Sequence, residues 1–161
     1  MIERLVEFFG ALPPEWIICL IAALPVSELR GAIPAGVILL DLPLWEVLLL
    51  SYLGNLLPVV PLLLFLRPVS RWLHRFSVWH WFFYWLFART RRRAKIVERY
   101  KGLGLALFVA VPLPVTGAWT GCAAAMLFRF RFWPAFLAIA SGVGISGLIV
   151  AGMVHAGLSL L

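Results

Sequence analysis

Two opposite charges lie inside an apolar stretch of the chain, and they are the residues best suited to chemistry. Glu28 and Arg30 are the only charged residues in the segment 16–40. A charged side chain at the centre of a membrane segment costs about 2.5–3.5 kcal/mol to insert, so such residues usually mark an ion or substrate pathway. Pro25 and Pro34 flank the pair, and proline interrupts a helix. We therefore predict a membrane-embedded ion or substrate site at Glu28 and Arg30.

The composition places this site in an integral membrane protein. Of the 161 residues, 63% are hydrophobic and 13% are charged, whereas soluble domains are nearer half apolar and about a quarter charged. The first residues include Glu3, Arg4 and Glu7 and lack a basic start, so we expect no removable signal peptide. The basic residues that give the net charge of +7 are concentrated between two apolar regions. This placement indicates that they set the membrane topology and contact anionic lipid head groups, rather than bind nucleic acid.

The sequence does not predict an enzyme. It has no Ser/His/Asp set, no phosphate-binding loop and no motif of an intramembrane protease. The three histidines have no cluster of carboxylates or cysteines beside them, so we expect no metal site. Cys19 and Cys122 both lie in apolar runs, which favours buried small side chains over a disulfide. We expect neither catalytic residues nor a cofactor.

Four apolar regions organise the chain. Two of them, 44–66 and 132–155, are not interrupted by charge after Glu46 at the start of the first, and they are long enough to cross about 30 Å of hydrocarbon at about 1.5 Å per residue. The other two, 16–40 and 103–128, contain helix breakers at their centres. Each arm of a broken region reaches only about half of the bilayer, which predicts re-entrant helical hairpins. The residues expected at the hairpin tips are Pro25, Gly31, Pro34, Pro112, Pro114 and Gly117.

The basic residues favour two hairpins over four full spans. The linker 67–101 holds ten basic residues and one acidic residue, so the positive-inside rule places it in the cytoplasm. If 103–128 is a hairpin, Arg129 and Arg131 also lie on that side, and twelve of the fourteen basic residues are cytoplasmic. Both termini then lie outside. We prefer this topology, in the plasma membrane of a prokaryote, and keep four full spans as the alternative.

Other segments are expected at the membrane surface. Residues 1–14 carry their apolar side chains on one helical stripe, which predicts an interfacial amphipathic helix too short to span. The aromatic segment 76–87 is expected to lie in the interface or to pack in an oligomer. The basic residues from Arg89 to Lys101 are expected to contact anionic lipid head groups. Because half-depth hairpins need protein around them, we also expect a homo-oligomer.

The two halves of the apolar sequence resemble each other. Residues 24–27 (LPVS) recur as 113–116 (LPVT), and Trp45 and Trp133 open the two uninterrupted regions. The small residues that then match are Ser51 with Ser141 and Gly54 with Gly144.

One full span between two hairpins makes the second copy enter from the opposite face, which is an inverted repeat. We therefore predict one all-α membrane domain over 1–161, with a binding site at the midplane between the hairpins. The polar residues expected at the site are Glu28, Arg30, Asn55 and Thr116.

The string from Glu28 to Pro34 (ELRGAIP), followed by Gly54-Asn55 in an uncharged span, resembles the small multidrug export protein family. The resemblance covers most of the chain and implies transport. The chain also resembles, in outline, the wider DedA or SNARE-associated group of membrane proteins. That likeness implies two facing re-entrant hairpins and movement of lipid phosphates. At 115–117 the chain has uncharged residues where that group has arginines, which leaves Arg30 as the embedded cation.

We predict a membrane transporter or lipid flippase, ion- or proton-coupled, in which Glu28 exchanges a proton or pairs with a cation. A four-span drug/proton antiporter of the small multidrug resistance type is one alternative, although the long basic loop and Arg30 argue against it. A non-transporting scaffold or assembly factor that binds partner helices is another. A purely structural Glu28–Arg30 ion pair is a further alternative. It would need an unwound turn, since residues i and i+2 face apart on a helix.

Overall fold

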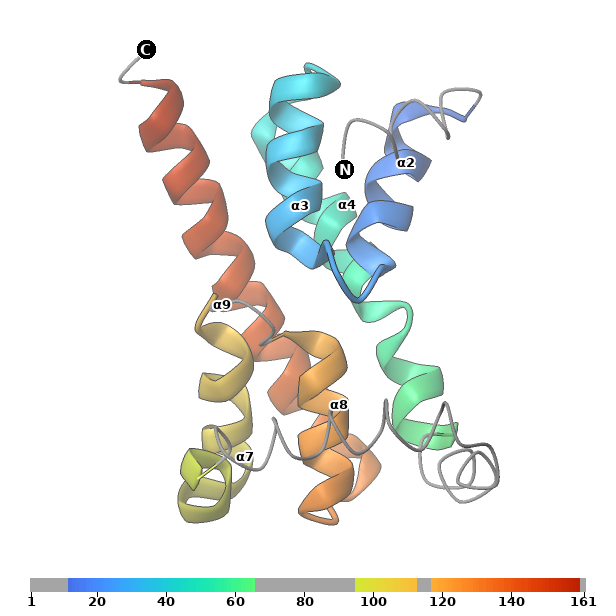
Figure 1. The fold of residues 1–161 in the computed structure, drawn as a ribbon, viewed down its shortest axis with the longest axis vertical. Helices are drawn as coiled ribbons and strands as arrows, with labels where there is room; N and C mark the ends of the chain where they lie inside the picture. Colours follow the sequence, from blue (N-terminus) through green and yellow to red (C-terminus); the bar gives the residue numbers. More distant parts are fainter. Residues whose placement is uncertain (1–11, 66–94, 113–116, 160–161) are drawn as a thin grey trace. The chain divides into compact units, whose positions relative to one another are not determined.

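The computed structural model describes residues 12–65, 95–112 and 117–159, and its regular elements in these ranges are all helical (Figure 1). The all-helical fold class is thereby confirmed. The interfacial helix expected at the N-terminus, the linker up to residue 94, and the site residues Pro114 and Thr116 lie outside the described residues. The chain divides into two compact units, which we call unit 1 (Met1–Pro58 with Val143–Leu161) and unit 2 (Val59–Gly142).

Two helices are long and apolar enough to cross a membrane. They are Leu44–Phe65, with 22 residues, and α9 (Phe132–Leu158), with 27 residues. The first begins with α4 (Leu44–Leu56) and continues as helix at 59–65 after a turn at Pro58, whose missing N–H interrupts the helical hydrogen bonds. These helices occupy the regions 44–66 and 132–155 that the sequence predicted as spans.

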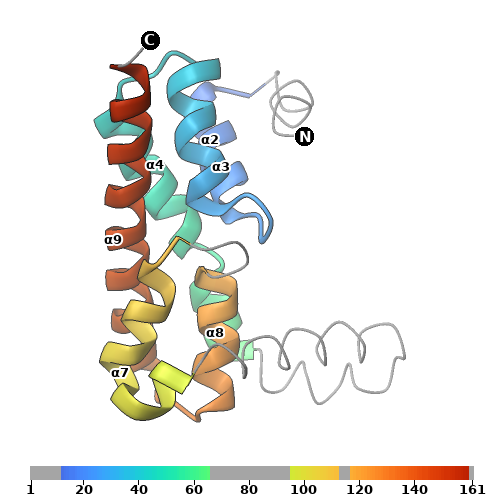
Figure 2. The ribbon, with the colours of Figure 1, turned by 60° about the vertical axis from the view of Figure 1, so that its left-hand side comes forward.

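Unit 1 packs two short helices against α4. α2 (Pro14–Ala23) ends at Leu24, whose backbone is extended, and a turn at 24–27 leads into α3 (Glu28–Pro34). The turn reverses the chain, so α2 and α3 lie side by side, and α3 runs opposite to α4 (Figures 1 and 2). The buried apolar residues between these helices include Ile17, Ile18, Ile21, Ala22, Leu29, Ala32, Ile33 and Val47.

The second short helix of unit 1 widens after Pro34 instead of ending there. Pro34 has no N–H to donate to the carbonyl four residues earlier. The chain continues as the π-helical turn η1 (Ala35–Leu39), and the N–H of Leu40 donates to the carbonyl of Ala35 at 3.1 Å. Gly31 and Pro34, which were predicted for a hairpin tip, therefore lie inside this helical arm. The chain reverses at 24–27, before this arm begins.

Unit 2 contains a second pair of short helices, α7 (Lys95–Ala110) and α8 (Ala118–Leu127). α7 bends at Lys101, where φ is 47° and ψ is −120°, at the predicted boundary between the basic linker and the apolar region. Thr120 fixes the start of α8. Its Oγ1 accepts a hydrogen bond from the N–H of Gly117 at 3.0 Å and donates one to the carbonyl of Gly117 at 3.2 Å.

Corresponding features occur 88 residues apart in the chain. α4 begins at residue 44 and α9 at residue 132. Just before each helix, Asp41 and Arg129 have left-handed φ angles of 52° and 55°. On the first turns, Trp45 and Trp133 are 69% and 68% exposed. The same local path therefore leads into both long helices.

Glycines on the long helices make matching contacts. A Cβ added to Gly54 would lie 2.5 Å from the carbonyl oxygen of Cys19 on α2. A Cβ added to Gly142 would lie 2.6 Å from the carbonyl oxygen of Ala106 on α7. Positions 54 and 142 are again 88 apart. In each unit, the long helix thus approaches the backbone of the first short helix at a glycine.

These contacts correct the residue pairing expected from the sequence. A Cβ on Gly144 would meet only the ring of Tyr52, at 3.6 Å, so Gly142 and not Gly144 corresponds to Gly54. Ser51 is fully buried, whereas Ser141 is exposed and bonds to its own helix. The offset of 88 residues that these contacts favour would pair Ser51 with Ile139, two residues before Ser141. Serine and glycine recur often enough in α9 to allow more than one alignment.

Candidate functional site

The break between α2 and α3 places Glu28 at the first position of α3. Its φ of 48° lies in the left-handed region, which a glutamate seldom adopts. Its N–H donates to the carbonyl of Leu24 at 3.1 Å, which closes the turn. A backbone conformation of this kind costs about 1–3 kcal/mol and persists where the surrounding structure requires it. The break therefore holds Glu28 in a geometry that an uninterrupted helix would not provide.

Arg30 lies two residues further along α3 and interacts electrostatically with Glu28. The side chains of both residues are partly exposed, whereas Ser27, Leu29 and Gly31 are buried. The charged groups consequently reach the surface of unit 1 while their neighbours fill its core. Because the backbone of Glu28 is not helical, the rule that residues i and i+2 face apart does not apply to this pair.

Three polar side chains of unit 1 are buried and have no hydrogen-bond partner among the described residues. Ser27 is 6%, Ser51 0% and Asn55 1% exposed, and both hydroxyls and both polar atoms of the Asn55 amide are unbonded. A buried polar atom without a partner costs about 1–3 kcal/mol. The sequence pointed to Asn55 but missed Ser27 and Ser51, because a serine in an apolar segment ordinarily indicates helix packing.

The other predicted site residues fall in different places. Pro25 is exposed in the turn of unit 1. Pro112 and Gly117 border the connection from α7 to α8 in unit 2. Glu28, Arg30 and Asn55 therefore belong to one unit, and Thr116 lies outside the described residues.

The cysteines do not form a disulfide. Both are free, and Cys122 is buried whereas Cys19 is partly exposed. The thiol of Cys19 donates to the carbonyl of Leu50 at 3.5 Å, which joins α2 to α4. Within the described ranges, no group of three or more His, Cys, Asp and Glu residues could hold a metal ion.

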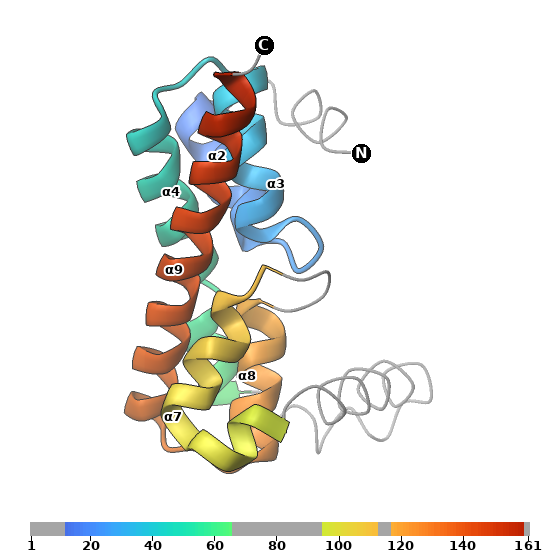
Figure 3. The ribbon, with the colours of Figure 1, turned by 90° about the vertical axis from the view of Figure 1, so that its left-hand side faces the viewer.

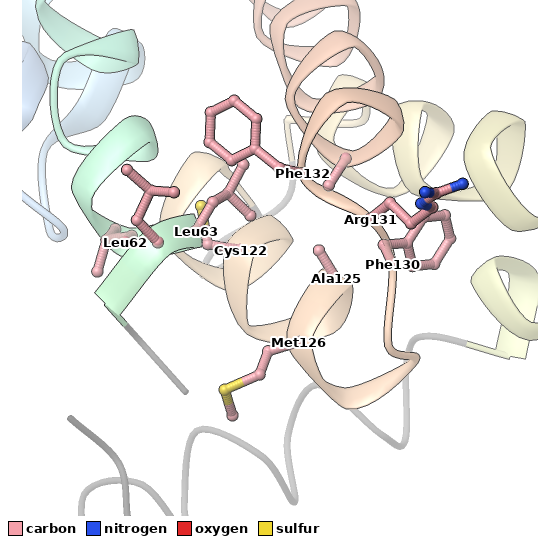
Figure 4. Close-up of a pocket in the computed structure, with 10 residues that line it drawn as sticks. Leu62, Leu63, Cys122, Ala125, Met126, Phe130, Arg131 and Phe132 are labelled. Atoms are coloured by element: carbon pink, nitrogen blue, oxygen red, sulfur yellow. The ribbon is translucent and has the colours of Figure 1, made fainter. Parts of the chain in front are cut away.

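Unit 2 contains a cavity of about 230 Å³ that the sequence did not predict. Figure 4 shows Leu62 and Leu63 on one side of it and Phe130 and Arg131 on the other. The lining is mostly apolar, and Arg131 is its charged residue. The full lining consists of Leu62, Leu63, Leu64, Cys122, Ala125, Met126, Phe130, Arg131, Phe132 and Ala135.

Residues 28–149 match the family model described as "Putative small multi-drug export protein". The match begins at Glu28 and covers most of the chain, so the protein belongs to this family, as its sequence resemblance indicated. No curated protein and no solved structure matches the sequence. The description of the family names export of small molecules as its suggested function. Together with the two long apolar helices, it indicates a membrane location.

Proposed function

We propose that this protein is a membrane transporter whose binding site lies in unit 1, at the break between α2 and α3. The observation that carries the proposal is the placement of Glu28, which combines a left-handed φ with a position at a helix break, next to Arg30. Charged residues within apolar segments and interrupted helices are typical of transport sites. In this proposal Glu28 exchanges a proton or a cation, and Arg30 holds Glu28 ionised or binds an anionic group of the substrate.

The short helix pairs are re-entrant hairpins in this proposal. α2 and α8 have ten residues each, which gives about 15 Å at about 1.5 Å per residue. The apolar part of α7, Tyr100–Ala110, is of similar length. None of these helices reaches across a hydrocarbon core of about 30 Å. Their lengths support hairpins and argue against a four-span antiporter.

The charges at corresponding turns support an inverted arrangement of the two repeats. The turn before α4 and the first turn of that helix carry Asp41 and Glu46, whereas the turn before α9 carries Arg129 and Arg131. Basic residues favour the cytoplasmic side of a membrane. Basic residues at one turn and none at the other are therefore expected if the two turns lie on opposite sides.

Two substrate classes follow from these features. The family description favours lipophilic drugs, and a lone embedded arginine favours a lipid with an anionic head group. Both are amphipathic molecules that a site at a helix break, between apolar helices, could admit from the bilayer.

The test is transport by the purified protein in liposomes. The probes are ethidium, driven by a pH gradient, and a fluorescent phosphatidylglycerol, followed by its movement between leaflets. Glu28→Gln and Arg30→Gln are compared with Glu46→Gln, a matched change of another acidic residue in unit 1. We expect at least a tenfold loss of transport for Glu28→Gln and little change for Glu46→Gln. Inactivity of the unmodified protein with both probes, or equal activity of these two variants, would contradict the proposal.

A further inference from the structure

Ser51 and Asn55 lie on the face of α4 that packs inside unit 1. They are four residues apart and therefore share one side of the helix. Gly54 on this side lies against the backbone of α2, and Val47, one turn before Ser51, lies against Gly36, where an added Cβ would be 2.6 Å from its side chain. The hydroxyl and the amide are consequently held between the helices of the unit.

Ser27 lies at about the same level as Asn55. α3 and α4 run in opposite directions (Figure 3), and Gly36 contacts Val47. Ser27 is nine residues before Gly36, and Asn55 is eight residues after Val47. At about 1.5 Å per helical residue, Glu28 and Asn55 each lie about 12 Å from that contact along their helices, and Ser27 directly precedes Glu28. The register therefore brings the serine of the break to the level of the buried amide.

Two of these residues do not make the side-chain hydrogen bonds that a serine commonly makes to its own helix. Ser141 on α9 donates to the carbonyl of Leu137, four residues earlier, at 2.7 Å. Ser51 makes no such bond. Ser27 occupies the N-cap of α3 without a side-chain capping bond. Their hydroxyls remain available for an occupant that is not part of the chain.

Packing alone does not require polar residues at these positions. The positions of α9 that correspond to Ser51 and Asn55, 88 residues later, hold Ile139 and Val143, which are 0% and 1% exposed. Apolar side chains therefore fill the equivalent places on the other long helix. The polar residues of α4 carry a desolvation cost that their counterparts avoid, and a bound ligand would offset it.

We infer that Ser27, Ser51 and Asn55 form a binding site for a monovalent cation, for which Na⁺ is the probe. Hydroxyl and amide oxygens are ligands for hard cations, whereas soft metals prefer thiolate or imidazole. The ligands are neutral, and Glu28 already interacts with Arg30, so a divalent ion would lack compensating charge.

The end of α2 adds a favourable electrostatic contribution. Ala23, the last residue of α2, is four residues beyond Cys19, and Pro58 is four residues beyond Gly54. Because Gly54 contacts Cys19 and both helices run in the same direction (Figure 1), the carboxyl end of α2 lies at about the level of Pro58, roughly 4.5 Å beyond Asn55 along α4. The carboxyl end of a helix is its negative end, which favours a cation.

The site extends the proposed function, because the bound cation would be the coupling ion for transport. Only this role as coupling ion rests on the proposed function. Binding itself is tested without transport, by thermal unfolding of the purified protein in NaCl and in choline chloride at equal chloride. We expect Na⁺ well above its Kd to raise the Tm by about 3–6 °C. The double variant Ser51→Ile/Asn55→Val, which copies the residues of α9, should lose this shift. Ser141→Ala should keep it.

A second variant keeps the test decisive if the double variant does not fold. Asn55→Asp adds a negative charge to the ligand set and should lower the Na⁺ concentration of half effect about tenfold. Equal Tm values in Na⁺ and choline for the unmodified protein would overturn the inference. A shift that persists in the double variant, or an unchanged midpoint in Asn55→Asp, would overturn it as well. An unmodified protein that shows the Na⁺ shift but transports neither probe would refute the proposed function and leave the cation site intact.

Discussion

Gly54 and Gly142 occupy the same place in their respective units. Each lies on a long apolar helix, and each would bring an added Cβ to 2.5–2.6 Å of a carbonyl oxygen on the first short helix of its unit. Backbone atoms cannot yield as the end of a flexible side chain can. The close approach of the helices therefore depends on the absence of a side chain at both positions.

Alanine at either glycine should destabilise the protein. We expect Gly54→Ala and Gly142→Ala each to lower the free energy of unfolding by about 1–3 kcal/mol, because the added methyl group overpacks the contact. The control is Gly152→Ala on α9, where no atom lies within 4 Å of the added Cβ, so the helix gains about 0.8–1 kcal/mol of propensity. Thermal unfolding in one detergent compares all three. Gly54→Ala as stable as Gly152→Ala would contradict the packing described here.

Exchanging the charges of Glu28 and Arg30 distinguishes a structural ion pair from a transport site. Each single charge reversal should lower the Tm, since two like charges would then stand at the break. The double variant Glu28→Arg/Arg30→Glu should recover stability but not transport, because the carboxylate has moved away from the left-handed position. Recovery of both properties in the double variant would indicate a structural ion pair and argue against a transport site.

Thr120 should contribute to stability without contributing to transport. Thr120→Val keeps the volume of the side chain and removes both hydrogen bonds to Gly117, so we expect a loss of about 1–2 kcal/mol. Ser141→Ala, at an exposed hydroxyl bonded to its own helix, should change stability by less than about 0.5 kcal/mol. Denaturant unfolding measures both. Lost transport in a Thr120→Val protein of unchanged stability would show a functional role instead.

The sequence predicted the helical elements well, because long uncharged runs and prolines leave few alternatives. The break near Pro25 and the starts of α4 and α9 follow directly from these signals. Pro34, like Pro25, was predicted to lie at a hairpin tip, but the structure differs at the two prolines. Pro25 lies in the turn that ends one helical arm, whereas Pro34 lies inside a helix that continues as a π turn. Local sequence signals do not distinguish these two positions.

The candidate site was only partly predictable. Glu28 and Arg30 stand out because charges are rare in apolar segments, and Asn55 stands out for its polarity. Ser27 and Ser51 were missed, since only burial and the absence of a partner in the described structure set them apart from a serine such as Ser141. The cavity beside Arg131 joins helices distant in sequence, which no local pattern reveals.

The most direct test of the account is the side of the membrane on which the two corresponding turns lie. Leu42 and Phe130 are 88 residues apart, are both uncharged and are partly exposed. Single cysteines at these positions, in a Cys19→Ala/Cys122→Ala background, would be labelled with a membrane-impermeant thiol reagent from each side of oriented vesicles. The account predicts that position 42 reacts from outside and position 130 from the cytoplasmic side. Labelling of both from the outside would mean four full spans and would contradict the inverted hairpins.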